Sequence, residues 1–137
     1  MIQSAQRDLR GEGLHSRAAS TYRRPDGIVQ IVFRDGIDIR EEEARDARTS
    51  IEWLIGDLGG VLVMADVRAA RSLAPAARRV ASDPRLSKLA VVVASPVTRW
   101  TGNAYLELRP LARPTRLFTS EDEALRWLRG EVPRPSR

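Results

Sequence analysis

The chain has 137 residues, of which 42% are hydrophobic and 30% charged, a composition typical of one globular domain whose core needs neither a metal ion nor a disulfide. The sequence contains no cysteine, which excludes disulfides, thiolate metal sites and cysteine nucleophiles and favours a reducing compartment such as the cytoplasm. The formal net charge is +5, but residues 1–24 and 129–137 carry all of this excess, so we expect no binding of nucleic acid.

The two basic ends have the composition of appendages to a compact middle. Residues 1–17 are polar and contain arginines, and they lack the apolar stretch of a secretory signal. We therefore expect a disordered or loosely attached leader over residues 1–17, a single domain over residues 18–130 and a frayed tail over residues 131–137. No apolar run approaches the roughly 18–20 residues that span a bilayer, so we expect no membrane span.

A hairpin is predicted at the start of this domain. Residues 18–24 and 28–34 flank the triplet Pro25-Asp26-Gly27. Proline presets the backbone of the first turn position and glycine accepts a positive φ, so the triplet favours a tight turn between two antiparallel strands.

Three further strands and four helices are expected after the hairpin. The strands are the short, continuous apolar runs 61–65, 89–94 and 115–118, which are typical of strands buried on both faces. The first helix begins at the capping pair Asp38 and Glu41 and extends to residue 58, and the second begins at Ser72 and stops before residue 83. The third begins at Ser95, which is followed by proline, and the fourth at a second capping box headed by Ser120.

This order of elements predicts the fold class. Short buried strands that alternate with helices imply a sheet with parallel neighbours and right-handed crossovers. We therefore expect an α/β fold: a mixed, largely parallel sheet of about five strands, with an N-terminal antiparallel hairpin and four helices.

Several segments resemble those of a known fold. They are the run VLVMADVR at residues 61–68, the sequence Ser95-Pro96-Val97 with Gly102-Asn103, and residues 114–119 followed by 123–128. Over roughly residues 21–128 the chain resembles the STAS-like fold, named for sulfate transporters and anti-sigma-factor antagonists, and within it the small stand-alone bacterial STAS-like proteins of uncharacterised function. The resemblance implies a non-enzymatic, regulatory or partner-binding domain.

The resemblance also implies a role for Ser72. In anti-sigma-factor antagonists a serine or threonine that opens the helix after the central strand is phosphorylated, and this switches partner binding; Ser72 holds the corresponding position. Those antagonists carry a cluster such as Asp-Ser-Ser-Gly there, whereas residues 70–75 of this chain read ARSLAP. The residues alone favour Ser72 as a plain helix cap, and both interpretations stay open.

One edge of the predicted sheet gathers polar side chains. Ligands of open α/β sheets collect beyond the carboxyl ends of parallel strands, near helix N-termini that favour anions. This edge is therefore a candidate site for a phosphate or carboxylate of a ligand or partner, although the serines are equally explained as caps and the arginines as solvated side chains. The candidate residues are Asp66, Arg68, Arg71, Ser72, Ser95, Thr98, Arg99 and Asn103.

No catalytic pattern stands out, so we expect no enzyme, cofactor or metal. The single histidine, His15, lies in the expected leader, which leaves no histidine-based triad in the domain. Gly59-Gly60 follows a helix and precedes a strand, the reverse of a phosphate-binding loop. The acidic runs 41–43 and 121–123 are best explained as first-turn residues that face water and suit the helix dipole.

The aromatic residues leave two functions open. Trp53, Trp100 and Trp127 lie on apolar helix stripes, so we expect them to fill the core or a groove. Alternatively, Trp100 and Tyr105 line an apolar pocket or the face of a homodimer. A flat, arginine-rimmed edge would favour the leading hypothesis, a domain that binds a protein partner. A deep pocket lined by Trp100 and Tyr105 would favour the alternative, a carrier or sensor of a small apolar or anionic ligand.

Overall fold

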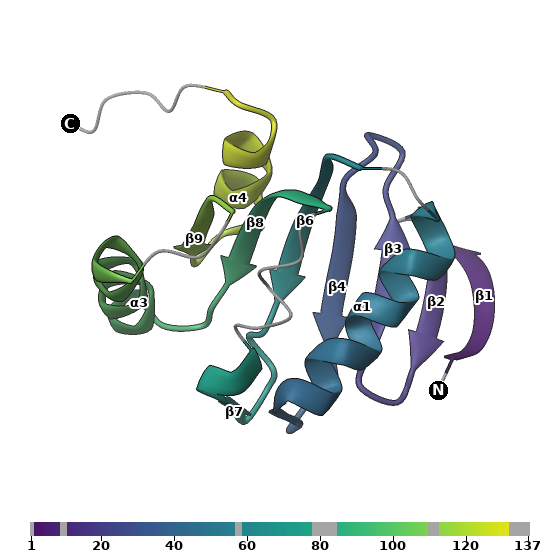
Figure 1. Cartoon of the computed structure of the whole chain (residues 1–137), viewed down its shortest axis with the longest axis horizontal. Coiled ribbons are helices and arrows are strands. Elements are labelled where there is room, and N and C mark those ends of the chain that lie inside the picture. Colours follow the sequence, from purple (N-terminus) through teal and green to yellow (C-terminus); the bar gives the residue numbers. More distant parts are fainter. Residues whose placement is uncertain (1, 9–10, 57–58, 78–84, 110–112, 132–137) are drawn as a thin grey trace.

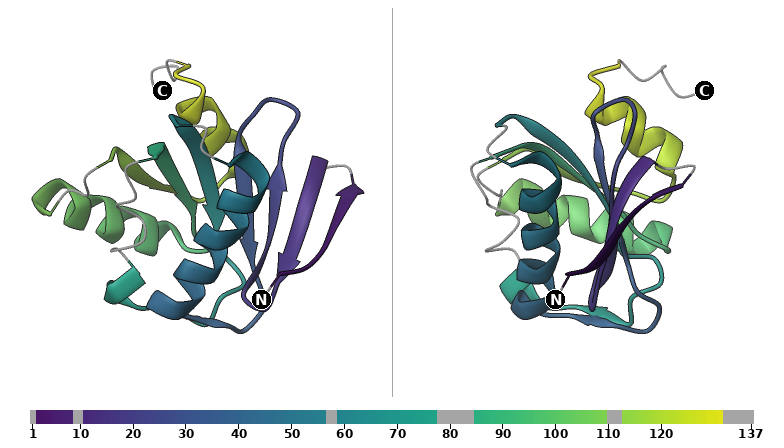
Figure 2. Two further views of the ribbon diagram at one scale, coloured as in Figure 1. Left: turned by 45° about the vertical axis from the view of Figure 1, so that its right-hand side comes forward. Right: turned by 90° about the vertical axis from the view of Figure 1, so that its right-hand side faces the viewer.

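The computed structural model describes residues 2–8, 11–56, 59–77, 85–109 and 113–131. Its centre is a seven-stranded sheet in the order β1-β2-β3-β4-β6-β8-β9, with helix α1 on one face, α4 on the other and α3 beside the edge strand β9 (Figure 1 and Figure 2). A second sheet contains only β5 and β7. The elements are β1 (Ile2–Asp8), β2 (Gly11–Ser16), β3 (Ala19–Arg23), β4 (Val29–Phe33), β5 (Asp38–Ile39), α1 (Glu41–Ile55), β6 (Val61–Asp66), β7 (Ser72–Leu73), a 3-10 turn (Pro75–Ala77), β8 (Leu86–Val92), α3 (Pro96–Leu108), β9 (Thr115–Phe118) and α4 (Glu121–Leu128).

The sheet is mixed, as predicted. Strands β1 to β4 are antiparallel neighbours, whereas β4, β6, β8 and β9 run parallel. Val63 in the middle of β6 pairs with Val29 of β4 and with Leu89 of β8. The predicted α/β fold class is confirmed, with more strands than the expected five and three α-helices among the described residues instead of four.

The parallel strands separate two apolar cores. Alternate side chains of a strand point to opposite faces, so Val63 packs under α1 with Ile31 and Ile51, while its neighbour Met64 packs under α4 with Leu125. Both valine-rich strands β6 and β8 are thus buried on each face. This explains why their sequences read as continuous apolar runs rather than as an alternation.

The predicted hairpin is confirmed by its turn. Gly27 has a φ of 86°, and its N–H donates to the carbonyl of Arg24 at 2.9 Å. The carboxylate of Asp26 accepts the N–H of Ile28 at 3.1 Å, which fixes the turn before β4 begins.

The N-terminal segment is part of the sheet, so the expectation of a disordered or loose leader over residues 1–17 is wrong. Strand β1 pairs with β2, and β2 pairs with β3 from Glu12↔Arg23 to His15↔Ser20. The side chains of Leu14 and Ser16 are buried, at 5% and 0% exposure. His15, which we expected in the leader, therefore lies in the sheet.

Helix α1 begins later than predicted. Asp38 lies in β5 and its carboxylate is occupied by Arg71 and Ser72, so it does not cap the helix. The N-cap is Arg40, whose N–H donates to the Glu43 carboxylate at 2.9 Å. The acidic residues 41–43 fill the first turn, but Glu43 is buried rather than solvated.

The burial of Glu43 leads to a pH dependence. Burial opposes its ionisation, but hydrogen bonds from the Arg40 N–H and from Arg17 at 3.2 Å outweigh that effect, so the pKa of Glu43 lies below its ordinary value of 4.5. The ionised group therefore stabilises the fold above its unfolded-state pKa, and this stabilisation is lost as the pH falls through the folded-state pKa. In urea unfolding at a series of pH values from about 5 down to about 3, we expect Glu43→Gln to lose stability less steeply than the wild type.

The matched control for this measurement is Glu42→Gln, which changes an exposed carboxylate in the same helical turn. It should keep the wild-type slope. A Glu43→Gln slope equal to that of the wild type would contradict the prediction.

The second predicted helix does not begin at Ser72. Residues 72–73 form β7, which pairs parallel with β5 and is followed by the 3-10 turn. The Arg71 N–H donates to the Ile37 carbonyl and the Ala74 N–H to the Ile39 carbonyl, both at 2.8 Å. These two bonds hold the backbone in a strand pairing. The rest of the expected helix, residues 78–84, lies outside the described residues.

The other two helix starts agree with the prediction. Ser95 caps α3 by accepting the N–H groups of Val97 and Thr98, and Ser120 caps α4 by accepting the N–H of Glu123 at 3.4 Å. No helix in the described ranges is long and apolar enough to cross a membrane.

Candidate binding surface around helix α3

The carboxylate of Asp66, at the end of β6, is hydrogen-bonded within its own chain. Asp66 is buried and accepts the N–H of Arg68 at 3.0 Å and two guanidinium hydrogen bonds from the same residue at 3.0 and 2.7 Å. The guanidinium also donates to Glu121 of α4 at 2.6 Å. Hydrogen bonds from the Arg68 guanidinium to these two carboxylates, that to Asp66 first, raise the pKa of Arg68. The charge of Arg68 is therefore balanced within its own chain. Glu121, which we expected to face water, is one of its two carboxylate partners.

Arg71 and Ser72, two of the predicted site residues, form a second cluster of side chains that are hydrogen-bonded to their shared partner, Asp38. Both bond to Asp38: Arg71 through two guanidinium nitrogens, one of them at 2.9 Å, and Ser72 through its hydroxyl at 2.6 Å. The hydrogen bonds from Arg71 and Ser72 hold the pKa of Asp38 well below its usual range. Ser72 is thus an exposed hydroxyl that donates to a carboxylate, and the prediction that it caps a helix is wrong.

The remaining candidates lie on α3, which is fastened to the sheet edge by one side chain. Asn103 donates to the Leu117 carbonyl at 3.1 Å and accepts the Leu117 N–H at 2.8 Å, so its amide pairs with β9 as a neighbouring strand would. The helix can lie this close because position 102 is glycine: a Cβ there would be 2.3 Å from Cδ2 of Leu117. The sequence analysis named Asn103 as a candidate for binding a ligand or partner, whereas its side chain bonds to β9.

The apolar residues of α3 are not part of the core. No residue of this helix is buried, and the exposed fractions are 70% for Val97, 72% for Trp100 and 83% for Leu108. The prediction that the helix stripes pack inward is therefore wrong for Trp100, and for Trp53 of α1, which is 71% exposed. Trp127 does pack as predicted, with its ring 5.6 Å from that of Phe118.

A mixed polar and apolar cavity of about 480 Å³ lies between α3 and β9, and we call it the Arg99 cavity. Arg99 and Arg116 line it, and neither forms an ion pair with a carboxylate in the described part of the chain. The Arg116 guanidinium lies 6.0 Å from the centre of the Phe118 ring. The residues that line the cavity are Arg99, Trp100, Asn103, Ala104, Glu107, Arg116, Leu117, Phe118 and Glu123.

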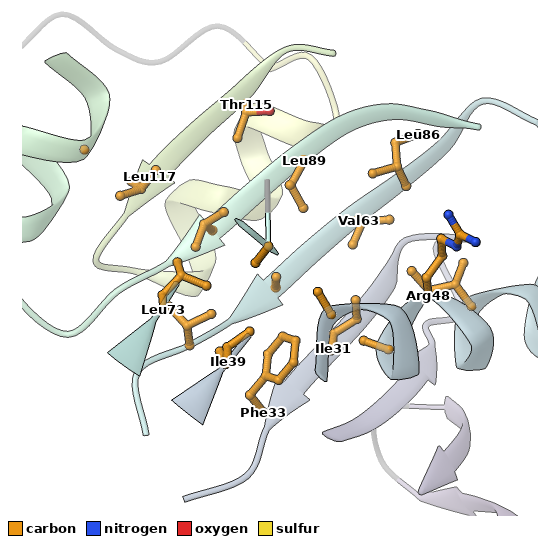
Figure 3. Close-up of a pocket in the computed structure, with 18 of the residues that line it drawn as sticks. Ile31, Phe33, Ile39, Arg48, Val63, Leu73, Leu86, Leu89, Thr115 and Leu117 are labelled. Atoms are coloured by element: carbon orange, nitrogen blue, oxygen red, sulfur yellow. The ribbon is translucent and has the colours of Figure 1, made fainter. Parts of the chain in front are cut away.

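A separate apolar groove of about 250 Å³ lies on the opposite side of α3, over β6 and β8 and beside α1 (Figure 3). Tyr105 lines this groove and Trp100 lines the Arg99 cavity, so the two residues do not share one pocket as the carrier hypothesis required. The charged residues that line the groove are Arg48 and Arg85, and Figure 3 shows Arg48 at the end of the groove away from Leu117.

The predicted edge therefore separates into three clusters. Asp66 joins Arg68 and Glu121, while Arg71 and Ser72 join Asp38. The α3 residues Arg99, Trp100 and Asn103 come together in the cavity, whereas Ser95 and Thr98 serve the helix cap. Arg116 was missed, because an isolated arginine in a short strand carries no sequence signal of a site.

Comparison with known proteins places the chain in a family. DUF7793, a domain of unknown function, matches residues 22–131. The chain belongs to the DUF7793 family. No curated protein matches the chain. A crystal structure of an uncharacterised DUF3478-family protein with a SpoIIAA-like fold, from Shewanella loihica PV-4, is similar over 81% of this chain and 92% of that one, with 13% identity and a TM-score of 0.57.

This structural similarity confirms that the DUF7793 chain has a STAS-like fold, since the S. loihica protein is described as SpoIIAA-like. A protein of unknown function from Arthrobacter sp. FB24 is 27% identical over 83% of this chain and 94% of that one, with a TM-score of 0.33. The similarity to the S. loihica protein concerns the fold alone.

Proposed function

We propose that this DUF7793 protein is a non-enzymatic interaction domain that contacts a protein partner through α3. The observation that carries the proposal is the exposure of Val97, Trp100 and Leu108 on a helix with no buried residue. Burying such a side chain is worth about 1.5–3 kcal/mol, so a partner that covers this helix gains a large apolar contribution. Apolar patches of this kind mark interaction sites on soluble domains.

The Arg99 cavity supplies the polar part of the same contact. Arg99 and Arg116 line it together with Trp100, and tryptophan and arginine are enriched among residues that dominate binding energy. A guanidinium group binds carboxylates in a bidentate manner. We therefore expect the partner to insert an acidic side chain next to the apolar contact.

The non-enzymatic part of the proposal rests on the placement of His15. Its Nδ1 atom lies 2.7 Å from the Ser20 hydroxyl, and neither residue lines the groove or the Arg99 cavity. We therefore assign this contact between a histidine and a serine no catalytic role.

The test uses a photoreactive benzoylphenylalanine at position 100 in the native host. We expect it to cross-link a protein of defined mass, and the same group at position 53 to give no such adduct, because Trp53 is equally exposed but lies on α1. Arg99→Glu should reduce the adduct at position 100. Identical adducts at both positions, or none at position 100, would overturn the proposal.

Ser72 is where we expect regulation to act. A phosphate on its hydroxyl would repel Asp38 and compete for Arg71, which now bonds to that carboxylate. Intact-mass measurement of protein from its own host should then show a phosphorylated fraction, absent from Ser72→Ala. An unmodified mass under all growth conditions would leave Ser72 as a structural residue.

The apolar groove favours a second candidate function, the binding of a small apolar ligand. Its lining is almost entirely aliphatic, from Ile31 and Val63 of the sheet to Ile51 of α1. Native mass spectrometry of protein from its own host should then detect a small molecule that is released on unfolding. Ala44→Phe, which adds a ring to the lining from α1, should remove that molecule and leave the cross-link at position 100 unchanged.

A further inference from the structure

The apolar groove over β6 and β8 carries charge at one end. Its charged lining residues are Arg48 of α1 and Arg85 just before β8, and no acidic residue lines it in the part of the chain that the structure describes. Both guanidinium groups lie within 4.0 Å of the carboxylate of Glu52, so they are at the same end of the groove. Figure 3 shows Arg48 at this end and Leu73 and Leu117 at the other. The groove therefore joins a cationic end to an apolar body.

We propose that the groove binds a single aliphatic chain that ends in a carboxylate, a free fatty acid of medium length, with the carboxylate at Arg48 and Arg85. The proposal rests on the second candidate function, the binding of a small apolar ligand in this groove, and it names the chemistry of that ligand. The aliphatic chain lies across β6 and β8, and its far end reaches Leu73 of β7.

The body of the groove suits a flexible aliphatic chain. Its walls include Ile51 of α1, Val63 of β6 and Leu89 of β8. Leu73 lines the far end and is 52% exposed, so a bound chain covers an apolar side chain that otherwise faces water. The hydrophobic effect is non-directional, and each methylene group that is buried raises the affinity about fourfold. The affinity of a series of fatty acids should therefore rise with chain length until the groove is full.

The volume of the groove limits the ligand to one chain. The groove encloses about 250 Å³, which is somewhat below the range of about 300–1,000 Å³ that is usual for pockets that hold drug-sized ligands. A phospholipid, with two long acyl chains, is too large for this space. A fatty acid of medium length has a volume that fits.

The cationic end already contacts one carboxylate, which indicates the head group of the ligand. The Glu52 carboxylate lies 4.0 Å from Arg48 and 3.5 Å from Arg85, beyond the distance of about 2.7–2.9 Å of a charge-assisted hydrogen bond. The Glu52 side chain is 46% exposed and does not line the groove, so it can turn toward the solvent. A guanidinium group binds a carboxylate in a bidentate manner. A ligand carboxylate at this end therefore competes with Glu52 for the two arginines.

Isothermal titration calorimetry of the full chain with sodium decanoate and with 1-decanol tests this assignment, because the two probes share one aliphatic chain and differ in the head group. We expect decanoate to bind at least about tenfold more tightly, since its hydrogen bonds to the arginines add to the same apolar contact. Arg48→Gln should remove most of this preference, whereas Glu52→Gln, which removes the competing carboxylate, should strengthen the binding of decanoate. The control is Arg45→Gln, at an exposed position on the same helix outside the groove, which should leave both affinities unchanged.

The outcomes separate this proposal from the second candidate function. If decanoate and 1-decanol bind equally well, or if a folded Arg48→Gln variant keeps the preference for decanoate, the fatty acid assignment is wrong and the groove still binds an apolar ligand. If neither probe binds, both are wrong. A preference for decanoate that depends on Arg48 and increases in Glu52→Gln supports both, and circular dichroism shows that the variants are folded.

Discussion

Removal of residues 1–16 is expected to abolish cooperative unfolding of the domain. The deletion takes away β2, and with it the buried side chain of Leu14 and the partner of β3. It also removes Ser16, whose carbonyl accepts two hydrogen bonds from Arg34, at 3.0 and 2.5 Å, and whose hydroxyl bonds to Asp46 of α1. Burial of a leucine is worth about 1.5–3 kcal/mol and each hydrogen bond to a charged group a similar amount.

These losses are large because they are comparable with the total stability of a small domain, about 5–15 kcal/mol. Thermal unfolding followed by circular dichroism measures the effect. The control is removal of residues 1–8, which takes away β1 alone and leaves the pairing of β2 with β3 intact. A melting temperature that stays within a few degrees of the wild type after removal of residues 1–16 would show that β2 contributes little to the fold.

The missed strands show which part of the fold is visible in the sequence. The strands β6 and β8 are continuous apolar runs, and the caps Ser95 and Ser120 are local signals that need no knowledge of the rest of the chain. In contrast, β2 contains two glycines and a histidine within six residues, which resembles neither a buried run nor an apolar alternation. Its pairing with β3 compensates for this weak local preference, and such compensation depends on tertiary contacts.

The same argument explains the outcome for the candidate site. The sequence predicted Arg68 and Arg71 as cations at the carboxyl edge of the sheet. Their carboxylate partners Glu121 and Asp38 are 53 and 33 residues away in the chain. No local pattern links residues so far apart, so these two ion pairs could not be predicted, although Asp66, the other partner of Arg68, lies only two residues away. The exposure of α3 was hidden for a related reason: an apolar helical stripe has the same sequence whether it faces the core of its own chain or another protein.

Replacement of Asp66 is expected to be the most destabilising single substitution at the carboxyl edge. Asp66 is 8% exposed and accepts three hydrogen bonds from Arg68, two of them from the guanidinium group. In Asp66→Ala the Arg68 guanidinium keeps Glu121 as its one charged partner among the described residues, and the backbone N–H of Arg68 loses its acceptor. Breaking a fully buried pair by removing one member costs about 3–5 kcal/mol. We expect a loss at or below the lower end of this range, because the Arg68 side chain is 38% exposed and keeps its ion pair with Glu121.

Urea unfolding of four variants, each compared with the wild type, separates the contributions of Asp66 to the stability of the loop. Asp66→Asn keeps a side-chain oxygen for the Arg68 N–H but removes the charge, so we expect a loss of stability intermediate between the wild type and Asp66→Ala. Glu121→Gln, at the half-exposed end of the network, should have the smallest effect. The double variant Asp66→Ala/Arg68→Ala also removes the Arg68 guanidinium. Its loss of stability should therefore be smaller than that of Asp66→Ala alone. A loss below about 1 kcal/mol for Asp66→Ala would contradict this argument, because it would mean that water replaces Asp66 at the end of β6.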